Sequence, residues 1–310
     1  MARGSGRDGF RLDAAKHIYS SYHGSDYKEK NHQFWREFRS EMEKVNSDVI
    51  LVGEVWDTAP VVAPYLDRGL HSAFNFDLSE AILSSVLANR DTGLVNALER
   101  NRNYYNESSD DYFDSTFITN HDMNRVMSEV RGDLNRAKMA ASLLLTLPGN
   151  PFIYYGEEIG MKGEKPDEDI RLPMRWYEDP TNTGQTTWRE DRYHNEEDGI
   201  TVESQLEDEE SLLNHYKELI YARRASEVLI KGEIQSVPIR ERGILLFERV
   251  TENEQKLVVH NLSNEMKKLH LDGDLEKYKE YYFYLGKIEE IEIKNKVLSI
   301  PPFTSVILKE

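Results

Sequence analysis

The sequence predicts an α/β fold followed by a small antiparallel β-domain. From residue 9 to about 226, short apolar strand-like runs alternate with helical patterns, as expected for βα units around a parallel sheet. From about 227 to 310 helical periodicity disappears, and strand-like runs separated by turn residues replace it. We therefore divide the chain into linker or vector residues at 1–8, an α/β part at 9–226 and an all-β domain at 227–310.

The α/β part contains five strand-like runs and two clear helices. The first helix is predicted from Asp133 to Leu147, because a capping residue opens it and Pro148-Gly149 closes it. The second carries an apolar stripe whose likeliest role is core packing. Its stripe residues are Leu212, Leu213, Tyr216, Leu219 and Ile220, and the predicted parallel strands are 9–15, 49–55, 72–76, 115–119 and 151–155.

Two further regions differ in composition. Residues 162–210 are rich in polar, Gly, Pro and aromatic residues without clear periodicity, which predicts a long loop, and such loops usually carry function or are disordered. In the β-domain, the predicted strands are 243–250, 256–262, 281–285 and 305–308.

Composition narrows the class of partner. The 310 residues are 39% hydrophobic, which suits a folded globular chain. A net charge of −17 argues against nucleic acid or anionic membrane as a partner and fits a neutral polysaccharide. There is no cysteine, no apolar run near the ~18 residues of a membrane span, and no targeting segment at residues 1–6.

Three acids stand at the carboxyl ends of predicted strands: Asp13, Glu54 and Asp122. Each alone has an ordinary explanation. Asp122 could cap a helix, and Asp13 could form a structural ion pair with Arg11. Their conjunction favours a site, because the carboxyl ends of parallel barrel strands meet on one face. Retaining glycoside hydrolysis needs two carboxyl groups about 5 Å apart.

The runs that hold these acids resemble the second, third and fourth conserved segments of the α-amylase family, glycoside hydrolase family 13. The runs are Gly9-Phe10-Arg11-Leu12-Asp13-Ala14-Ala15-Lys16-His17, Val49 to Trp56, and Ser115 to Asp122. The resemblance implies that the five strands are strands 4 to 8 of a (β/α)8 barrel. The chain is then expected to be the carboxyl-terminal portion of a bacterial α-amylase that lacks the first three barrel strands and the inserted domain.

The resemblance also implies roles. Asp13 would be the nucleophile, kept ionised by Arg11; Glu54 would be the acid/base, with apolar neighbours that favour its protonated form; Asp122 would be the third acid, which hydrogen-bonds sugar hydroxyls. For Lys16 and His17, a solvated lysine and a capping histidine remain the alternative. The residues expected to contact sugar are Arg11, Lys16, His17, Trp56, Asn120 and His121.

Two ion sites follow from the resemblance. Calcium (Ca2+) is implied through the backbone carbonyl of His17, with the remaining ligands expected upstream of residue 1. Chloride is not expected, because Glu157 and Glu158 stand where chloride-activated members carry a basic residue. The tyrosines of 152–157 are interpreted mostly as core. The stretch 170–176 resembles one in bacterial α-amylases. Trp176 or Tyr177 could stack on the face of a sugar, or could pack against the protein.

The sequence thus predicts a hydrolase that cleaves α-1,4-glucosidic bonds in starch with retention, with activity impaired in the truncated chain. The alternatives are a non-catalytic saccharide-binding or interaction module, or an α-1,6-glucosidase or transglycosylase of the same family. Exposed barrel edges predict self-association. By resemblance, the parent protein would be extracellular or in the cell envelope.

Overall fold

The computed structural model describes residues 8–195, 198–239, 241–285 and 290–310. The proposed linker at 1–8 therefore lies outside the described residues except for Asp8, whose carbonyl accepts a hydrogen bond from the amide of Ile50 at 2.9 Å. The chain forms two compact units. Unit 1 comprises 1–79, 96–117 and 149–152, and unit 2 comprises 80–95, 118–148 and 153–310.

Unit 1 holds the parallel strands in chain order. Strands β1, β2 and β3 form a parallel sheet, a parallel bridge between Phe74 and Ser115 leads to β4, and β4 pairs in parallel with β5. This arrangement is the one predicted for five consecutive strands of a (β/α)8 barrel. The bounds are β1 Gly9–Leu12, β2 Ile50–Gly53, β3 Ser72–Ala73, β4 Ser115–Thr116 and β5 Asn150–Pro151.

All five strands are shorter than the sequence predicts, because the chain turns soon after each carboxyl end. After β1, Ala14 adopts the left-handed conformation with φ 44°, and the 3-10 helix η1 (Ala15–His17) follows at once. At the other end of β1, a Cβ on Gly9 would lie 2.2 Å from the carbonyl oxygen of Ile50, so only glycine permits the approach to β2.

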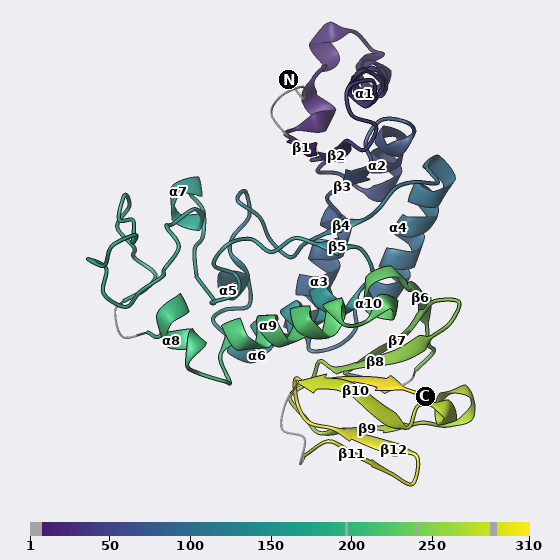
Figure 1. Ribbon diagram of the computed structural model, residues 1–310, viewed down its shortest axis with the longest axis vertical. Coiled ribbons are helices and arrows are strands. Elements are labelled where there is room, and N and C mark those ends of the chain that lie inside the picture. The colour runs from purple at the N-terminus through teal and green to yellow at the C-terminus, as the bar shows by residue number, and fades with distance from the viewer. Residues whose placement is uncertain (1–7, 196–197, 240, 286–289) are drawn as a thin grey trace. The chain divides into compact units, whose positions relative to one another are not determined.

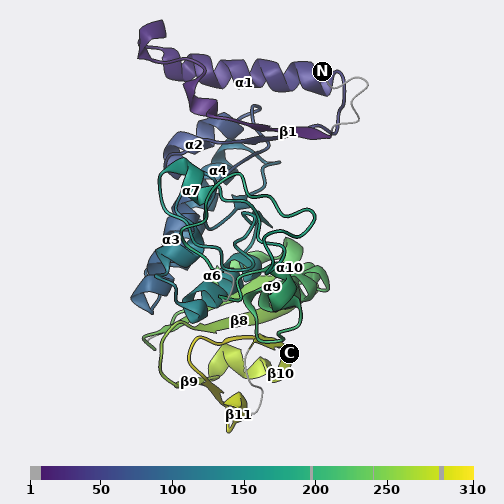
Figure 2. The same ribbon diagram turned by 90° about the vertical axis from the view of Figure 1, so that its left-hand side faces the viewer.

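Helices α1 (Tyr27–Glu43) and α2 (Ala59–Leu66) pack with the sheet of unit 1. Figure 2 shows α1 lying alongside β1. The core of this unit is apolar and aromatic, and its residues include Trp35, Leu51, Val55, Tyr65, Leu66 and Leu70. The two helices α3 (Phe76–Ala88) and α4 (Leu94–Ser108) follow β3.

Unit 2 contains the two helices predicted from sequence. Helix α6 (Leu134–Thr146) begins where the side chain of Asp133 accepts hydrogen bonds from the amides of Asn135 and Arg136, as its capping position predicts. Helix α9 (Leu212–Arg224) buries Leu212, Tyr216 and Leu219 of the predicted stripe and packs along α6 (Figure 1). The short helices are α5 Val126–Glu129, α7 Asp167–Ile170, α8 Val202–Leu206 and α10 Glu227–Lys231.

The carboxyl-terminal strands form two antiparallel sheets in unit 2. One has the order β10-β13-β8-β7-β6 and the other the order β11-β12-β9. The four predicted strands are present, and the shorter β6, β9, β11 and β12 escape sequence prediction because each has at most four residues. The bounds are β6 Glu233–Ser236, β7 Ile244–Val250, β8 Gln255–Asn261, β9 Lys267–His270, β10 Glu280–Leu285, β11 Glu292–Lys294, β12 Val297–Ile300 and β13 Ser305–Lys309.

Buried polar groups join α6 to the sheets within unit 2. Arg223 donates hydrogen bonds to the carbonyls of Leu145 and Leu147 at 2.8 and 2.9 Å, and Arg249 donates to the carbonyl of Thr146 at 2.5 Å. These cations meet the negative end of the α6 dipole. In addition, His260 lies between the hydroxyls of Thr146 and Ser305, at 3.1 and 2.7 Å.

Among the described residues, no helix is both long and apolar enough to span a lipid bilayer.

Candidate active site

The predicted site residues fall in both units, and each group is described in turn. In unit 1, Arg11 brings two of the three acids together. Its guanidinium pairs with the Asp13 carboxylate, and its Nη2 lies 3.0 Å from Oε2 of Glu54. Residues 11 and 54 stand on or just after the adjacent parallel strands β1 and β2, so their side chains leave the same edge of the sheet.

The two acids differ in exposure. The side chain of Asp13 is 78% exposed, whereas that of Glu54 is 10% exposed and its Oε2 also accepts a hydrogen bond from the amide of Ala14 at 3.0 Å. The surroundings of Glu54 are therefore less apolar than the sequence predicts, because Arg11 serves both carboxylates. One carboxylate is open to an incoming ligand, and the other is held beside it.

Lys16 lies just beyond β1 and is engaged by the loop after β2. Its ammonium donates hydrogen bonds to the carbonyl of Trp56 at 2.5 Å and to the carboxylate of Asp57 at 2.9 Å. Burial alone would raise the pKa of Asp57, but the hydrogen bonds from Lys16 and from the amide of Thr58 outweigh it, so the pKa is lowered. Lys16 is thus fixed rather than freely solvated.

Helix α1 supports this loop through two residues that sequence analysis missed. The buried Asn31 donates hydrogen bonds to the carbonyls of Lys16 and Tyr19 and accepts one from the amide of Tyr19, at 2.8 to 3.0 Å. One turn later, the indole of Trp35 donates to the carbonyl of Ala15 at 2.8 Å. Their i, i+4 spacing, which places both on one helix face, is the signal that could have identified them.

His17 and Trp56 are both available at the surface of unit 1. The side chain of His17 is exposed. Trp56 is 45% exposed, and one face of its ring stacks on Phe76 with centroids 4.6 Å apart and an interplanar angle of 10°. A ring that is fixed on one face and partly exposed can stack on a sugar.

The implied calcium ligand is a single backbone carbonyl, that of His17. Calcium takes six to eight oxygen ligands, most of them from carboxylates and carbonyls. Among the residues that the structure describes, no three His, Asp or Glu side chains are grouped to hold a metal ion. The single carbonyl of His17 therefore does not fit calcium by itself.

In unit 2, the third acid is held by its neighbours and by a distant arginine. The amide of Asp122 donates to the side-chain oxygen of Asn120 at 2.9 Å, and the Nε2 of His121 lies 3.3 Å from Oδ2 of Asp122. Arg171 donates from Nη2 to Oδ1 of Asp122 at 2.6 Å and from Nε to the carbonyl of His121 at 2.9 Å. Asp122 does not cap α5, whose N-cap is Arg125.

Arg171 is a functional candidate to which sequence analysis gave no role. Its two neighbours in the chain, Ile170 and Leu172, are both buried. A cation in the middle of a buried apolar stretch must leave that stretch at a defined point, because a charge is costly to bury without a partner. That pattern could have singled it out.

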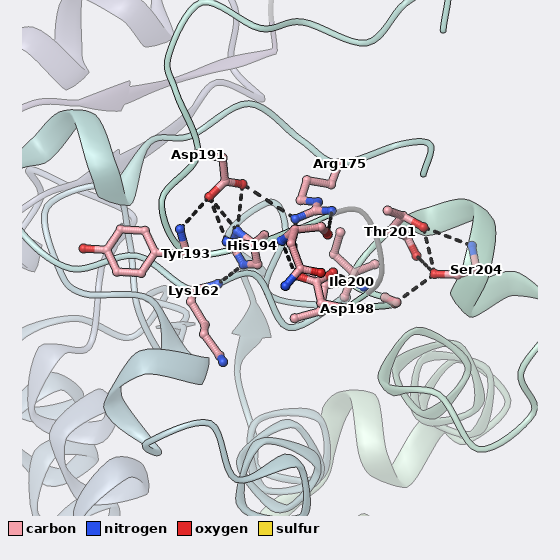
Figure 3. A network of polar contacts seen from close by, with 12 residues as sticks. Lys162, Arg175, Asp191, Tyr193, His194, Asp198, Ile200, Thr201 and Ser204 are labelled. Atoms are coloured by element: carbon pink, nitrogen blue, oxygen red, sulfur yellow. Dashed lines mark hydrogen bonds and ion pairs between the residues drawn. The ribbon is translucent and has the colours of Figure 1, made fainter. Parts of the chain in front are cut away.

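The loop that carries Arg171 is folded onto polar networks of its own. The buried Asp169 accepts hydrogen bonds from Arg189 at 2.6 and 3.0 Å and also pairs with Arg192. In the network drawn in Figure 3, the ring of His194 bonds to Asp191 through Nδ1 at 2.8 Å and accepts from the amide of Lys162 at Nε2, also at 2.8 Å. These contacts hold the described residues of the loop in a defined conformation.

Taken with the parallel strands, acids at carboxyl strand ends define a barrel enzyme of the glycosidase type. Comparison with known proteins agrees. A family model described as the α-amylase catalytic domain matches residues 2–232, and one described as the α-amylase SusG C-terminal domain matches residues 244–307. This chain belongs to the α-amylase family, glycoside hydrolase family 13.

Named relatives span several activities. Alpha-amylase 3 of Dictyoglomus thermophilum is 41% identical over 98% of this chain and 58% of the relative, and a 4-alpha-glucanotransferase of Thermotoga neapolitana is 34% identical over 84% and 56%. A crystal structure of an α-amylase from H. orenii matches with a TM-score of 0.88 and 38% identity, over 98% of this chain and 61% of the other. The chain thus spans somewhat more than half the length of these relatives.

Proposed function

We propose that this chain carries the acids of a retaining glycoside hydrolase that cleaves α-1,4-glucosidic bonds in starch and related α-glucans. The observation that carries the proposal is the guanidinium of Arg11, which contacts both Asp13 and Glu54. Two carboxylates that contact one guanidinium are near neighbours, which supports the ~5 Å spacing of the two carboxyl groups that a retaining mechanism requires.

In this mechanism Asp13, the exposed carboxylate, attacks the anomeric carbon while Glu54 protonates the departing glycosidic oxygen. The bond to the leaving sugar breaks as the bond to Asp13 forms. Glu54, now a carboxylate, then takes a proton from water, and the hydroxide oxygen displaces Asp13 from the sugar. Arg11 stabilises the carboxylate form of both acids in turn. Asp122 would hydrogen-bond sugar hydroxyls in the orientation that Arg171 fixes.

Transfer to a second sugar is the competing outcome, and the glucanotransferase relative favours it as a second candidate. In that case a sugar hydroxyl replaces water in the second step, with the same acids in the same roles. A product profile on starch, pullulan and maltooligosaccharides separates the two, because transfer yields products longer than the substrate.

The proposal is tested in this chain and in a chimera that places the amino-terminal part of the Dictyoglomus relative before residue 8. We expect little turnover by the chain alone, since catalytic groups need a complete supporting shell, and turnover of starch by the chimera. In the chimera, Asp13→Asn should lower kcat by at least about three orders of magnitude. Near-normal turnover by this variant would refute the assignment of Asp13 as the nucleophile.

Glu54→Gln tests the acid/base in the same chimera. The variant should lose far more activity on maltooligosaccharides than on activated aryl glycosides, whose leaving groups need no proton. Asp48→Asn is the matched control, because Asp48 is an exposed acid at the opposite, amino-terminal end of β2. Equal losses on both substrate classes would contradict the role of Glu54.

The open sheet of unit 1 also supports the expectation of self-association. Among the described residues, β1 pairs only with β2 and β5 only with β4, so each leaves one edge of backbone groups without a strand partner. Such edges favour pairing with another chain. Light scattering of the isolated chain should give dimers or larger species that decrease in the chimera, and a monomer in both would contradict this.

A further inference from the structure

We propose that Tyr154 and Tyr155 are positioning residues for Asp122, and that they act through the backbone on both sides of Arg171. This inference rests on the proposed function, because it assigns the two tyrosines a task in the same site. Sequence analysis interpreted them mostly as core. Their hydroxyl groups, however, make contacts that packing alone does not require.

The first step is the pair of hydroxyl bonds. Tyr154 donates to the carbonyl of Ile170 at 3.1 Å, and Tyr155 donates to the carbonyl of Leu172 at 2.7 Å. The carbonyl of Ile170 belongs to the peptide unit that directly precedes Arg171, and the carbonyl of Leu172 to the unit between Leu172 and Pro173, so the backbone around Arg171 is held from outside the loop. Burial raises the pKa of Tyr154, so its hydroxyl keeps the proton that it donates.

The second step runs from Arg171 to the acid. With its backbone fixed, the guanidinium reaches the carbonyl of His121 through Nε at 2.9 Å and Oδ1 of Asp122 through Nη2 at 2.6 Å. The same Nη2 also donates to Oδ2 of Asp167 at 2.9 Å, and a planar fork that bonds acceptors in different directions sets orientation as well as charge. Displacement of the fork would turn the Asp122 carboxylate, whose side chain is only 30% exposed.

The third step explains why the tyrosines can act as fixed points. Arg125 is 1% exposed, and its Cζ lies 4.7 and 4.8 Å from the ring centroids of Tyr154 and Tyr155. Its Nη1 donates to the carbonyl of Tyr155 at 2.6 Å, and its amide donates to the carbonyl of Gly163 at 2.9 Å. A desolvated cation over two rings holds both in place.

Tyrosine-to-phenylalanine variants separate this role from packing, since they keep the rings beside Arg125 and remove only the hydroxyls. In the chimera, Tyr154→Phe/Tyr155→Phe should lower kcat about tenfold, in the range of outer-shell positioning groups. The matched control is Tyr282→Phe, because the Tyr282 hydroxyl also donates to a backbone carbonyl, that of Ala222 at 2.9 Å, but has no link to Arg171. The control should keep wild-type kcat.

Coupling then tests the route through Arg171. In an Arg171→Met background the tyrosine changes should have no further effect on kcat, because the group that they position is absent. Full additivity of the two losses would overturn the proposal, since a purely structural role of the hydroxyls would act regardless of Arg171. So would a tenfold loss in Tyr282→Phe.

A second readout needs no turnover and uses this chain alone. The Nε–H of Arg171 is bonded to the carbonyl of His121, so its solvent hydrogen exchange, followed by NMR, should be at least tenfold faster in Tyr154→Phe/Tyr155→Phe and unchanged in Tyr282→Phe. If the chimera shows no turnover, the proposed function fails while exchange still decides the positioning role. Unchanged exchange in the double variant would refute that role.

Discussion

The predicted site residues of the two units are held in different ways. In unit 1, Asp13 and Glu54 are joined by Arg11, which stands two residues before one acid on a strand that pairs directly with the strand of the other. In unit 2, Asp122 depends on Arg171, which is 49 positions away on a long loop. The first part follows from strand pairing, whereas the second requires an irregular segment to fold correctly.

The comparison predicts that Arg11 is the more critical arginine, since two acids share it. In the chimera, Arg11→Met should lower kcat about 100-fold or more, because it removes the cation beside both reacting carboxylates. Arg11→Lys should recover only part of the loss, since a point charge cannot contact two carboxylates as a fork does. The measurement is kcat on maltooligosaccharides. Wild-type kcat in Arg11→Met would remove the basis of the comparison.

In unit 2, a substitution elsewhere in the loop that carries Arg171 should destabilise that loop. Asp169→Asn removes a buried charge that pairs with Arg189 and Arg192, and should lower the free energy of unfolding by about 2–3 kcal/mol, below the full cost of an uncompensated buried charge because both arginines are partly exposed. Glu190→Gln, an exposed acid of the same loop, should change it little. Denaturant unfolding measures both, and equal effects would contradict a specific role for Asp169.

Unit 2 should also show its own dependence on pH. Burial lowers the pKa of His260 to about 3, below the ~6.5 of an unfolded histidine. Between these two pKa values the unfolded state binds more protons than the folded state. The free energy of unfolding therefore falls as the pH falls from about 6.5 towards 3, by ~1.4 kcal/mol for each pH unit. His260→Gln should reduce that slope in thermal unfolding. An unchanged slope would assign the acid sensitivity to other groups.

The smallest effect is expected at the amino-terminal end of β2. Asp48→Asn should change the free energy of unfolding by less than about 0.5 kcal/mol and leave kcat unaltered, because the side chain is exposed and far along the strand from Glu54. Calorimetry and the starch assay check this. A large loss of kcat would show that position along the strand does not distinguish functional from ordinary acids.

Sequence patterns predicted what depends on periodicity and strand order. The parallel order of β1 to β5 follows from alternating apolar runs, and helices α6 and α9 follow from capping signals and helical spacing. The choice of Asp13, Glu54 and Asp122 depends on the resemblance to the α-amylase family as well as on their places after predicted strands. Helix α10 and strand β9 did not follow, since elements of four or five residues carry almost no periodic signal.

The supporting residues carry local sequence signals, but their partners could not be predicted for a different reason. Asn31, Trp35 and Arg171 act through backbone carbonyls and carboxylates that lie far away in the chain, and a single sequence contains no record of such contacts. The roles of the site residues remain predictions, and the variants above test them.

The arginines at the end of α6 bear on how the protein can be divided. The carbonyls of Leu145, Thr146 and Leu147 are bonded by Arg223 and Arg249, and the second of these arginines comes from β7. A fragment that stops before β7 would leave the carbonyl of Thr146 without that donor. We therefore expect the carboxyl-terminal sheets to be inseparable from α6 in folding, so that proteolysis between them destroys the unit instead of releasing a module.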